Sequence, residues 1–436
     1  MRARRRSSLR DLRTAAGFLA VVATAAAAGA LGAGERPAAR WVSHVVPEAG
    51  GQVTAGPNGR PIQVRYDGWD DSDFSRFPTY SHADRRVSPP VQTVADSIDL
   101  RGDAARGEQV WKRSACINCH VVPNDGRWAG NVGPSLAAYG GGVDPLETYQ
   151  VIHDPRAVIA DSIMPPWGTS GLLSAQEIAD VTAYLHSDKT PVRDGDLRDE
   201  PASRPLPEAY FGDNLDSGNN PAVLLGEQAD AAWRQAGAAG RSCSSCHGED
   251  INAAMKGVAV KYPRFSPRYG RVVSIEDFLS AHAWEEAGTA MPVAGDDNLH
   301  MTVRIKMASN GERIALELEN PDLQAALARG QQVFHRRVGQ RNHACADCHS
   351  DATVGNKWLG GRYLGRATIE AGLTSRYPTW RTSFEELWSI RKRFQWCMLP
   401  HGTNNLSADA VEYAELELYL TSFENGKPMS VPGLKD

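Results

Sequence analysis

The sequence predicts a mainly α protein built from three compact helical modules in tandem, and two observations predict this fold class. The pentapeptide Cys-x-x-Cys-His occurs three times within the 436 residues. Helix-forming patterns flank the first and third copies in the same order, so that each copy lies between an early and a late helix. A chain of this length is long enough for several domains. Its net charge of −5, with acidic and basic residues interspersed, argues against a nucleic-acid partner.

The N-terminus has the pattern of an export signal. A basic stretch, MRARRRSSLR, precedes an apolar run from Ala15 to Ala33 that is rich in Ala and Gly. This composition favours a cleaved signal peptide over a membrane anchor, which is usually richer in Leu and Ile. We therefore expect residues 1–34 to be removed, and the mature protein to be periplasmic with no stable membrane span.

Composition divides the rest of the chain. Residues 35–95 are rich in Gly, Pro and Asp and predict an irregular leader, and residues 188–220 predict a linker. Between these two stretches, residues 96–187 predict the first module. We expect the second and third modules at residues 221–319 and 320–436.

An internal repeat supports this division. The pattern RG-x-QVW at residues 106–111 precedes the first pentapeptide, and RG-x-QVF at residues 329–334 precedes the third. The late helices end in V-x-x-YL at 181–185 and in L-x-x-YL at 416–420, and a capping box at 174–177 predicts the start of the first of them. A small all-α domain can close around a prosthetic group when a small residue and an aromatic on its early helix pack against an apolar late helix. The simpler alternative is two ordinary amphipathic helices per domain.

The three pentapeptides predict three covalently bound haem c groups, in cytochrome c-like domains. Two thiols at this spacing reach the two vinyl groups of one porphyrin and form thioethers, and the adjoining His ligates the iron. A zinc site needs cysteine pairs in twos, and a redox dithiol has no need of the His. The expected attachment residues are Cys116, Cys119, Cys243, Cys246, Cys345 and Cys348, and the expected proximal ligands are His120, His247 and His349.

The sixth iron ligands decide what each haem does. For the first haem we expect Met164, which lies in DSIMPP before the late helix, and His/Met ligation suits an electron acceptor because it raises the potential. For the third haem, both Cys397 and Met398 follow the basic residues 391–393 and are candidate ligands. Cys397 is the seventh cysteine and lies outside the motifs. Basic neighbours favour its thiolate, the form that ligates iron and attacks sulfur, whereas the alternative is an inert buried thiol beside a Met ligand.

These stretches together resemble the SoxAX family of sulfur-oxidising c-type cytochromes. The first module resembles the monohaem subunit SoxX in GNVGPSL, DPR and DSIMPP. The rest resembles SoxA in SCSSCHGED, MKGVAVKYPRF, RVGQRNHACADCH, LGG, RYPTWR, the basic run into Cys397-Met398, and ELELYL. The chain therefore resembles a natural fusion of SoxX and SoxA.

This resemblance implies the activity of an L-cysteine S-thiosulfotransferase. Thiosulfate would be joined oxidatively to a cysteine of a SoxYZ-type carrier protein, and two electrons would pass from the third haem to the first and on to a soluble cytochrome c. In this family a haem-ligating cysteine, often a persulfide, is the active-site sulfur, and Cys397 matches it. The family's catalytic arginine matches Arg393, which would neutralise a dianionic substrate. A surface or propionate-binding role is the alternative for Arg393.

The sequence departs from the family pattern in two places. A Val-Arg-Ala segment usually follows the active-site cysteine, whereas residues 399–403 here read LPHGT, in which His401 would supply some positive character. The family ligates the first haem of SoxA with another cysteine, and His282 takes that position here. We therefore expect His282 as the sixth ligand of the middle haem, with Met291 as its competitor.

Two other functions compete with the thiosulfotransferase. One is a triheme electron carrier with no substrate site, which the unpaired Cys397 beside three cations disfavours. The other is a thiosulfate dehydrogenase that forms tetrathionate, which the SoxX-like module and the sequence around Cys397 disfavour.

Overall fold

The computed structural model describes residues 90–95, 101–122, 129–136, 143–187, 220–350, 358–360, 362–365, 374–398, 406 and 408–435, and the backbone of two short antiparallel strands, β1 (Val45–Pro47) and β2 (Val53–Ala55). The predicted signal peptide, most of the leader and all of the linker except Asn220 lie outside these residues. The elements below belong to one compact unit, Val42–Ser266 with Arg271–Asp436, and Pro267–Gly270 belongs to another. None of the described helices is both long enough and apolar enough to span a membrane.

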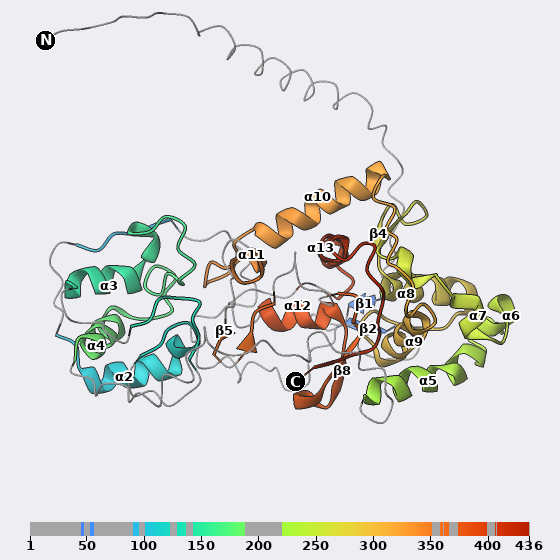
Figure 1. The fold of residues 1–436 in the computed structure, drawn as a ribbon, viewed down its shortest axis with the longest axis horizontal. Coiled ribbons are helices and arrows are strands. Elements are labelled where there is room, and N and C mark those ends of the chain that lie inside the picture. The colour runs from blue at the N-terminus through green and yellow to red at the C-terminus, as the bar shows by residue number, and fades with distance from the viewer. Residues whose placement is uncertain are drawn as a thin grey trace, which may run out of the picture. The chain divides into compact units, whose positions relative to one another are not determined.

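Helices dominate the described chain, which agrees with the mainly α fold class (Figure 1). Around the first motif lie α2 (Ala104–Arg113), η2 (Cys116–Asn118), α3 (Pro145–His153), η3 (Pro155–Ala157) and α4 (Ala175–His186). Helix α4 begins at the predicted capping box, because the Ser174 hydroxyl accepts from the Glu177 amide and the Glu177 carboxylate accepts from the Ser174 amide. The residues expected on its apolar face, Ile178, Val181 and Leu185, are buried.

The middle motif lies in a second group of helices. These elements are α5 (Pro221–Arg234), α6 (Cys243–His247), α7 (Ile251–Met255), η7 (Ala259–Lys261), β3 (Arg264–Ser266), β4 (Arg271–Val273), α8 (Ile275–Ala287) and α9 (Asp296–Met307). Strands β3 and β4 are antiparallel, with Phe265 opposite Val272.

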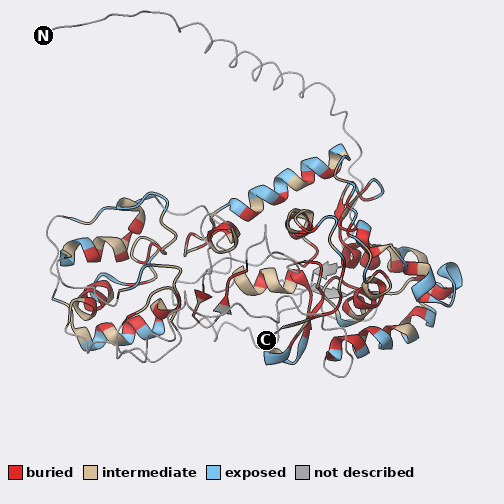
Figure 2. Cartoon of the chain, viewed as in Figure 1, coloured by how far each residue is buried: buried red, intermediate tan, exposed pale blue. Residues whose placement is uncertain are grey.

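The third motif lies among helices and short strands. These elements are α10 (Pro321–His335), α11 (Cys345–His349), β5 (Trp358–Leu359), β6 (Arg362–Tyr363), β7 (Thr379–Arg381), η8 (Thr382–Phe384), β8 (Glu386–Trp388), α12 (Ile390–Met398), α13 (Val411–Ser422) and β9 (Gly433–Lys435). Strand β7 pairs antiparallel with β8 and parallel with β9. Helix α10 buries Leu323, Ala326, Gly330 and Phe334 on one stripe and exposes its opposite face (Figure 2).

The repeated glycine lets the early and late helices cross closely. A Cβ on Gly107 of α2 would lie 1.9 Å from the carbonyl oxygen of Asp180 in α4. A Cβ on Gly330 of α10 would lie 2.1 Å from the carbonyl oxygen of Glu415 in α13. Because backbone atoms cannot move aside as side chains do, only glycine permits these two crossings.

The residues around the glycine are repeated as well. Arg106 pairs with the Asp180 carboxylate at 2.8 Å, and Arg329 pairs with the Glu415 carboxylate at 2.7 Å. The aromatic rings that follow also correspond, with centroids 6.0 Å apart for Trp111 and Tyr184 and 5.3 Å apart for Phe334 and Tyr419. The repeat in the sequence is therefore a repeated helix–helix contact, while the division into three domains stays a prediction.

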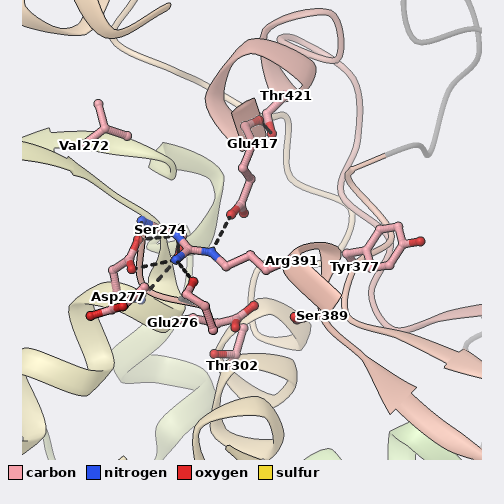
Figure 3. A network of polar contacts seen from close by, with 12 residues as sticks. Val272, Ser274, Glu276, Asp277, Thr302, Tyr377, Ser389, Arg391, Glu417 and Thr421 are labelled. Carbon is pink, nitrogen blue, oxygen red and sulfur yellow. Dashed lines mark hydrogen bonds and ion pairs between the residues drawn. The ribbon is translucent and has the colours of Figure 1, made fainter. Parts of the chain in front are cut away.

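A buried ion pair joins α12 to α8 (Figure 3). Arg391 and Asp277 are both fully buried, and the Arg391 Nη1 donates to Asp277 Oδ1 at 2.8 Å while Nη2 donates to Asp277 Oδ2. Nη1 also donates to the carbonyl of Ala408 at 2.7 Å, and Nη2 to Ser274 Oγ at 3.1 Å. The Glu417 carboxylate lies 3.7 Å from the Arg391 Nε. Several acceptors thus stabilise the charge of Arg391, and a buried ion requires such compensation.

Glu276 is a third carboxylate in this network. It is 5% exposed, and among the described residues its Oε2 has no hydrogen-bond partner. Burial raises the pKa of Glu276 to about 7, although the nearby Arg391 opposes the shift. The folded chain therefore holds a proton on Glu276 under mildly acidic conditions, where an exposed glutamate has released it.

The close crossing of α10 and α13 predicts the effect of Gly330→Ala. Helix propensity alone would favour alanine by about 1 kcal/mol, but the clash with the Glu415 carbonyl should dominate and destabilise the protein by about 2 kcal/mol. Thermal unfolding of the haem-loaded protein measures this change. The matched control is Gly226→Ala in α5, for which the three atoms nearest to the added Cβ belong to side chains: Met307 Sδ and Val303 Cγ1, both at 2.8 Å, and Val303 Cβ at 3.6 Å. Equal melting temperatures for the two variants would contradict the backbone-clash explanation.

The raised pKa of Glu276 predicts that its contribution to stability depends on pH. Between the unfolded pKa of about 4 and the folded pKa of about 7, the folded state binds more protons, so stability falls as pH rises through this window. Glu276→Gln, which stays neutral, should therefore raise the melting temperature more at pH about 8 than at pH about 5. Glu285→Gln, an exposed position on the same helix, controls for the change to an amide. A gain for Glu276→Gln that is the same at both pH values would refute this prediction.

Candidate functional site

The first motif presents His120 in a fixed orientation. Its Nδ1 donates to the carbonyl of Pro134 at 2.7 Å, which leaves Nε2 as the atom that can bind a metal. A Cβ on Gly133 would lie 2.3 Å from the His120 ring, so glycine leaves the space that the ring needs. Burial lowers the pKa of His120, and the neutral imidazole is the form that ligates metals. Met164 packs against the same core cluster as Cys116.

The histidine of the third motif is oriented by the same kind of hydrogen bond. The His349 Nδ1 donates to the carbonyl of Gly365 at 2.6 Å, so that its Nε2 is again free of this hydrogen bond. Asp347, inside the motif, caps the short helix by accepting from the Ala344 amide at 3.0 Å. Burial raises the pKa of Cys345 to about 12, which indicates the apolar surroundings in which a porphyrin edge would lie.

Cys397 lies beside the third motif. Burial is the first cause of the raised pKa of Cys345, and the electrostatic interaction with Cys397 is the next; Cys397 also acts on Cys348. Cys397 is near the end of α12, and Phe394 of that helix packs against the cluster that includes Cys345. Cys397 and the neighbouring Met398 are both half-buried. The structure thus brings the seventh cysteine to the haem motif that the sequence assigned to it.

The three cations before Cys397 have different surroundings. Arg391 is held in the buried network with Asp277, and Lys392 pairs with the Glu386 carboxylate at 2.6 Å. Arg393 lies with its guanidinium carbon 4.6 Å from the centre of the Trp396 ring. Because side chains four residues apart share one face of a helix, Arg393 is the cation on the face of Cys397. Arg391 and Lys392 are thus held by carboxylates, and the expectation that all three cations act on the thiol stays a prediction.

The middle motif brings two histidines together. The ring centroids of His247 and His282 are 6.0 Å apart. Two imidazoles that bind one metal through bonds of about 2 Å place their centroids about 6 Å apart, so this pair fits an iron between them. The His282 ring stacks on Phe278 at 5.0 Å, and the Trp233 ring lies 5.7 Å from that of His247. The competing residue Met291 is buried, and its carbonyl accepts from Asn298 at 2.9 Å.

Sequence reasoning missed the residues that connect the first and third motifs. The Gly360 amide donates to the carbonyl of Asn118, inside the first motif, at 2.8 Å. The Trp358 amide donates to Asn131 Oδ1 at 2.8 Å, and the Asn131 amide donates back to the Trp358 carbonyl at 3.1 Å. Burial raises the pKa of Cys348, and the electrostatic interaction with Cys119 of the first motif is the next cause. Two of these residues, Asn131 and Gly360, lie in the stretches GNVGPSL and LGG, whose only signal in the sequence is the family resemblance.

One predicted feature of the site lies outside the described residues. It is the segment 399–403 with His401, which replaces the arginine that follows the active-site cysteine in the family.

Two family profiles match this chain. The profile of the SoxA/TsdA cytochrome c domain matches residues 228–314 and 329–429. The profile described as cytochrome c oxidase, cbb3-type, subunit III, matches residues 102–185, within the stretch expected to form the first module. Both descriptions are of cytochrome c domains or subunits, and they agree with covalently bound haem c in this chain.

Individual proteins match about half of this chain. The L-cysteine S-thiosulfotransferase subunit SoxA of Pseudaminobacter salicylatoxidans is 30% identical over 223 residues, which are 50% of this chain and 75% of that protein. The corresponding subunit of Rhodovulum sulfidophilum is 25% identical over 51% of this chain and 75% of its own length. The crystal structure of SoxXA from P. pantotrophus covers 50% of this chain and 80% of its own, with 26% identity and a TM-score of 0.45. The chain is therefore a c-type cytochrome that belongs to the SoxA family.

Proposed function

We propose that this chain is a periplasmic L-cysteine S-thiosulfotransferase that joins thiosulfate to a cysteine of a SoxYZ-type carrier protein. The observation that carries the proposal is the position of Cys397, beside the third Cys-x-x-Cys-His motif and on the helix face that also bears Arg393. Relatives with the name of this enzyme's SoxA subunit match half of the chain.

The proposed reaction has two steps at Cys397. A sulfur–sulfur bond first forms between the Cys397 thiolate and the outer sulfur of thiosulfate, and two electrons leave. The carrier's thiolate then attacks that outer sulfur, so that the carrier holds the thiosulfate group and Cys397 departs as thiolate. The proton of the carrier thiol goes to solvent. Arg393 stabilises the dianion as it approaches a thiolate that is itself negative.

Three haem c groups are part of the proposal. When bound, they accept the two electrons one at a time and pass them to a soluble cytochrome c. The proposed thioether residues are the six motif cysteines, and the proposed axial pairs are His120 with Met164, His247 with His282, and His349 with Cys397. The hydrogen bonds from residues 358–360 to Asn118 and Asn131 support the proposed transfer of electrons from the third haem to the first.

The distance between His247 and His282 predicts the result of replacing His282. His282→Ala should convert one low-spin haem signal in electron paramagnetic resonance to a high-spin signal, because the iron loses its sixth ligand and keeps its thioethers. Met291→Ala is the matched control and should leave that signal unchanged. The opposite result, a change with Met291→Ala and none with His282→Ala, would reverse the assignment.

Cys397→Ser tests the reacting sulfur. Intact mass should show three haems on the variant, the spectrum of the third haem should change, and conjugation of thiosulfate to the carrier should be lost. Arg393→Gln should retain the spectrum and slow turnover roughly 100-fold, as loss of a charge-stabilising donor does. Lys392→Gln removes an adjacent positive charge that is already paired with Glu386, and should affect turnover far less.

Each failure of this experiment has a different meaning. Conjugation by Cys397→Ser near the wild-type rate would defeat the enzyme proposal and leave an electron carrier. Tetrathionate as the product, with no carrier adduct, would indicate a thiosulfate dehydrogenase. Fewer than three haems on the mature wild-type protein would refute the haem count.

A further inference from the structure

The loop that carries Met164 is held from outside its own group of helices. Residues 161–167 lie between η3 and α4 and form no helix or strand. The Met164 amide donates to Ser162 Oγ at 3.2 Å within the loop. The carbonyl groups of the three residues before Met164 instead accept hydrogen bonds from residues of the stretch 337–343, more than 170 positions later in the chain.

Two side chains of that stretch make these hydrogen bonds, and a third packs on the loop. The Arg337 Nη2 donates to the carbonyl of Asp161 at 3.0 Å, and its Nη1 donates to that of Ser162 at 3.2 Å. The His343 Nε2 donates to the carbonyl of Ile163 at 2.7 Å. On the other side of Met164, the Arg341 guanidinium lies 5.1 Å from the centre of the Trp167 ring. We call Arg337, Arg341 and His343 the clamp.

The clamp is anchored in the third haem motif. The Arg337 Nε lies 3.1 Å from the carboxylate of Asp347, which is one of the two residues between the cysteines of that motif and is buried. Asp347 is itself fixed by the Ala344 amide. A guanidinium is planar and rigid, so the carboxylate that orients one edge of Arg337 also aims its other nitrogens at the loop. One side chain thus connects the third motif to the residues directly before Met164.

We propose that the clamp positions the sulfur of Met164 on the iron of the first haem, so that the third haem motif sets the geometry of its electron acceptor. The inference rests on the proposed ligation by Met164 and adds three positioning residues to it. An irregular loop has few intrinsic constraints, and three successive carbonyl contacts remove most of its freedom directly beside the ligand. Since methionine ligation raises the potential, a loosened loop should lower the potential of the first haem.

The test uses the haem-loaded protein with the two hydrogen-bonding clamp residues, Arg337 and His343, replaced singly. Arg337→Ala and His343→Ala should weaken the sulfur-to-iron absorption band of the oxidised first haem and shift its midpoint potential downward. His343→Gln, whose amide can still donate to Ile163, should restore most of the band. Arg336→Ala, an exposed neighbour at the end of α10, should leave both the band and the potential at their wild-type values.

The outcomes separate the clamp from the ligation on which it rests. Met164→Ala should abolish the band, and a band that survives this change would refute the ligation. A band lost in Met164→Ala but unchanged in both Arg337→Ala and His343→Ala would overturn the clamp alone. An equal loss in Arg336→Ala would also overturn it, because the effect would then be general destabilisation.

Discussion

The buried pair of Arg391 and Asp277 is the interaction on which the arrangement of the second half depends. The two residues are 114 positions apart, and neither is exposed to solvent. Removing one partner of such a pair leaves an uncompensated buried charge, which costs several kcal/mol. Asp277 also accepts from the Ser274 amide at the start of α8, and Arg391 is the second residue of α12. The pair therefore fixes the starts of two helices relative to one another.

These two helices carry two of the candidate iron ligands, His282 and Cys397. Helix α8 presents His282 to His247 in the middle motif, and α12 presents Cys397 to the third motif. Because both helices begin at one ion pair, the candidate ligands of two haems share a common support. The same pair removes Arg391 from the surroundings of Cys397, so the positive charge on the thiol's helix face comes from Arg393. The helix thus separates a basic run in the sequence into Arg391 and Lys392, which pair with carboxylates, and Arg393, which shares the helix face of Cys397.

Two sets of contacts connect the first and third motifs. One comes from the β5 region, where Trp358 and Gly360 bond to the residues around Asn118. The other is the clamp, which acts on the loop before Met164. The first set acts on the backbone inside and just after the first motif, and the second acts on the loop of its expected distal ligand. Under the proposed function these contacts would bear on electron transfer between the two haems, because that transfer depends on their separation and their potentials.

The sequence alone determined the parts that depend on local spacing. Local geometry suffices to predict a feature whose residues lie within one or two helical turns of each other. The three pentapeptides, the capping box at Ser174 and the Arg-Gly repeat are features of this kind. The fold class and the SoxA family followed from the same patterns. Tertiary structure alone decided which distant groups meet: Arg391 with Asp277, Arg337 with the Met164 loop, and Trp358 with Asn131. A hydrogen bond between residues more than 100 positions apart leaves no period or spacing in the sequence, because its geometry exists only after the helices have packed.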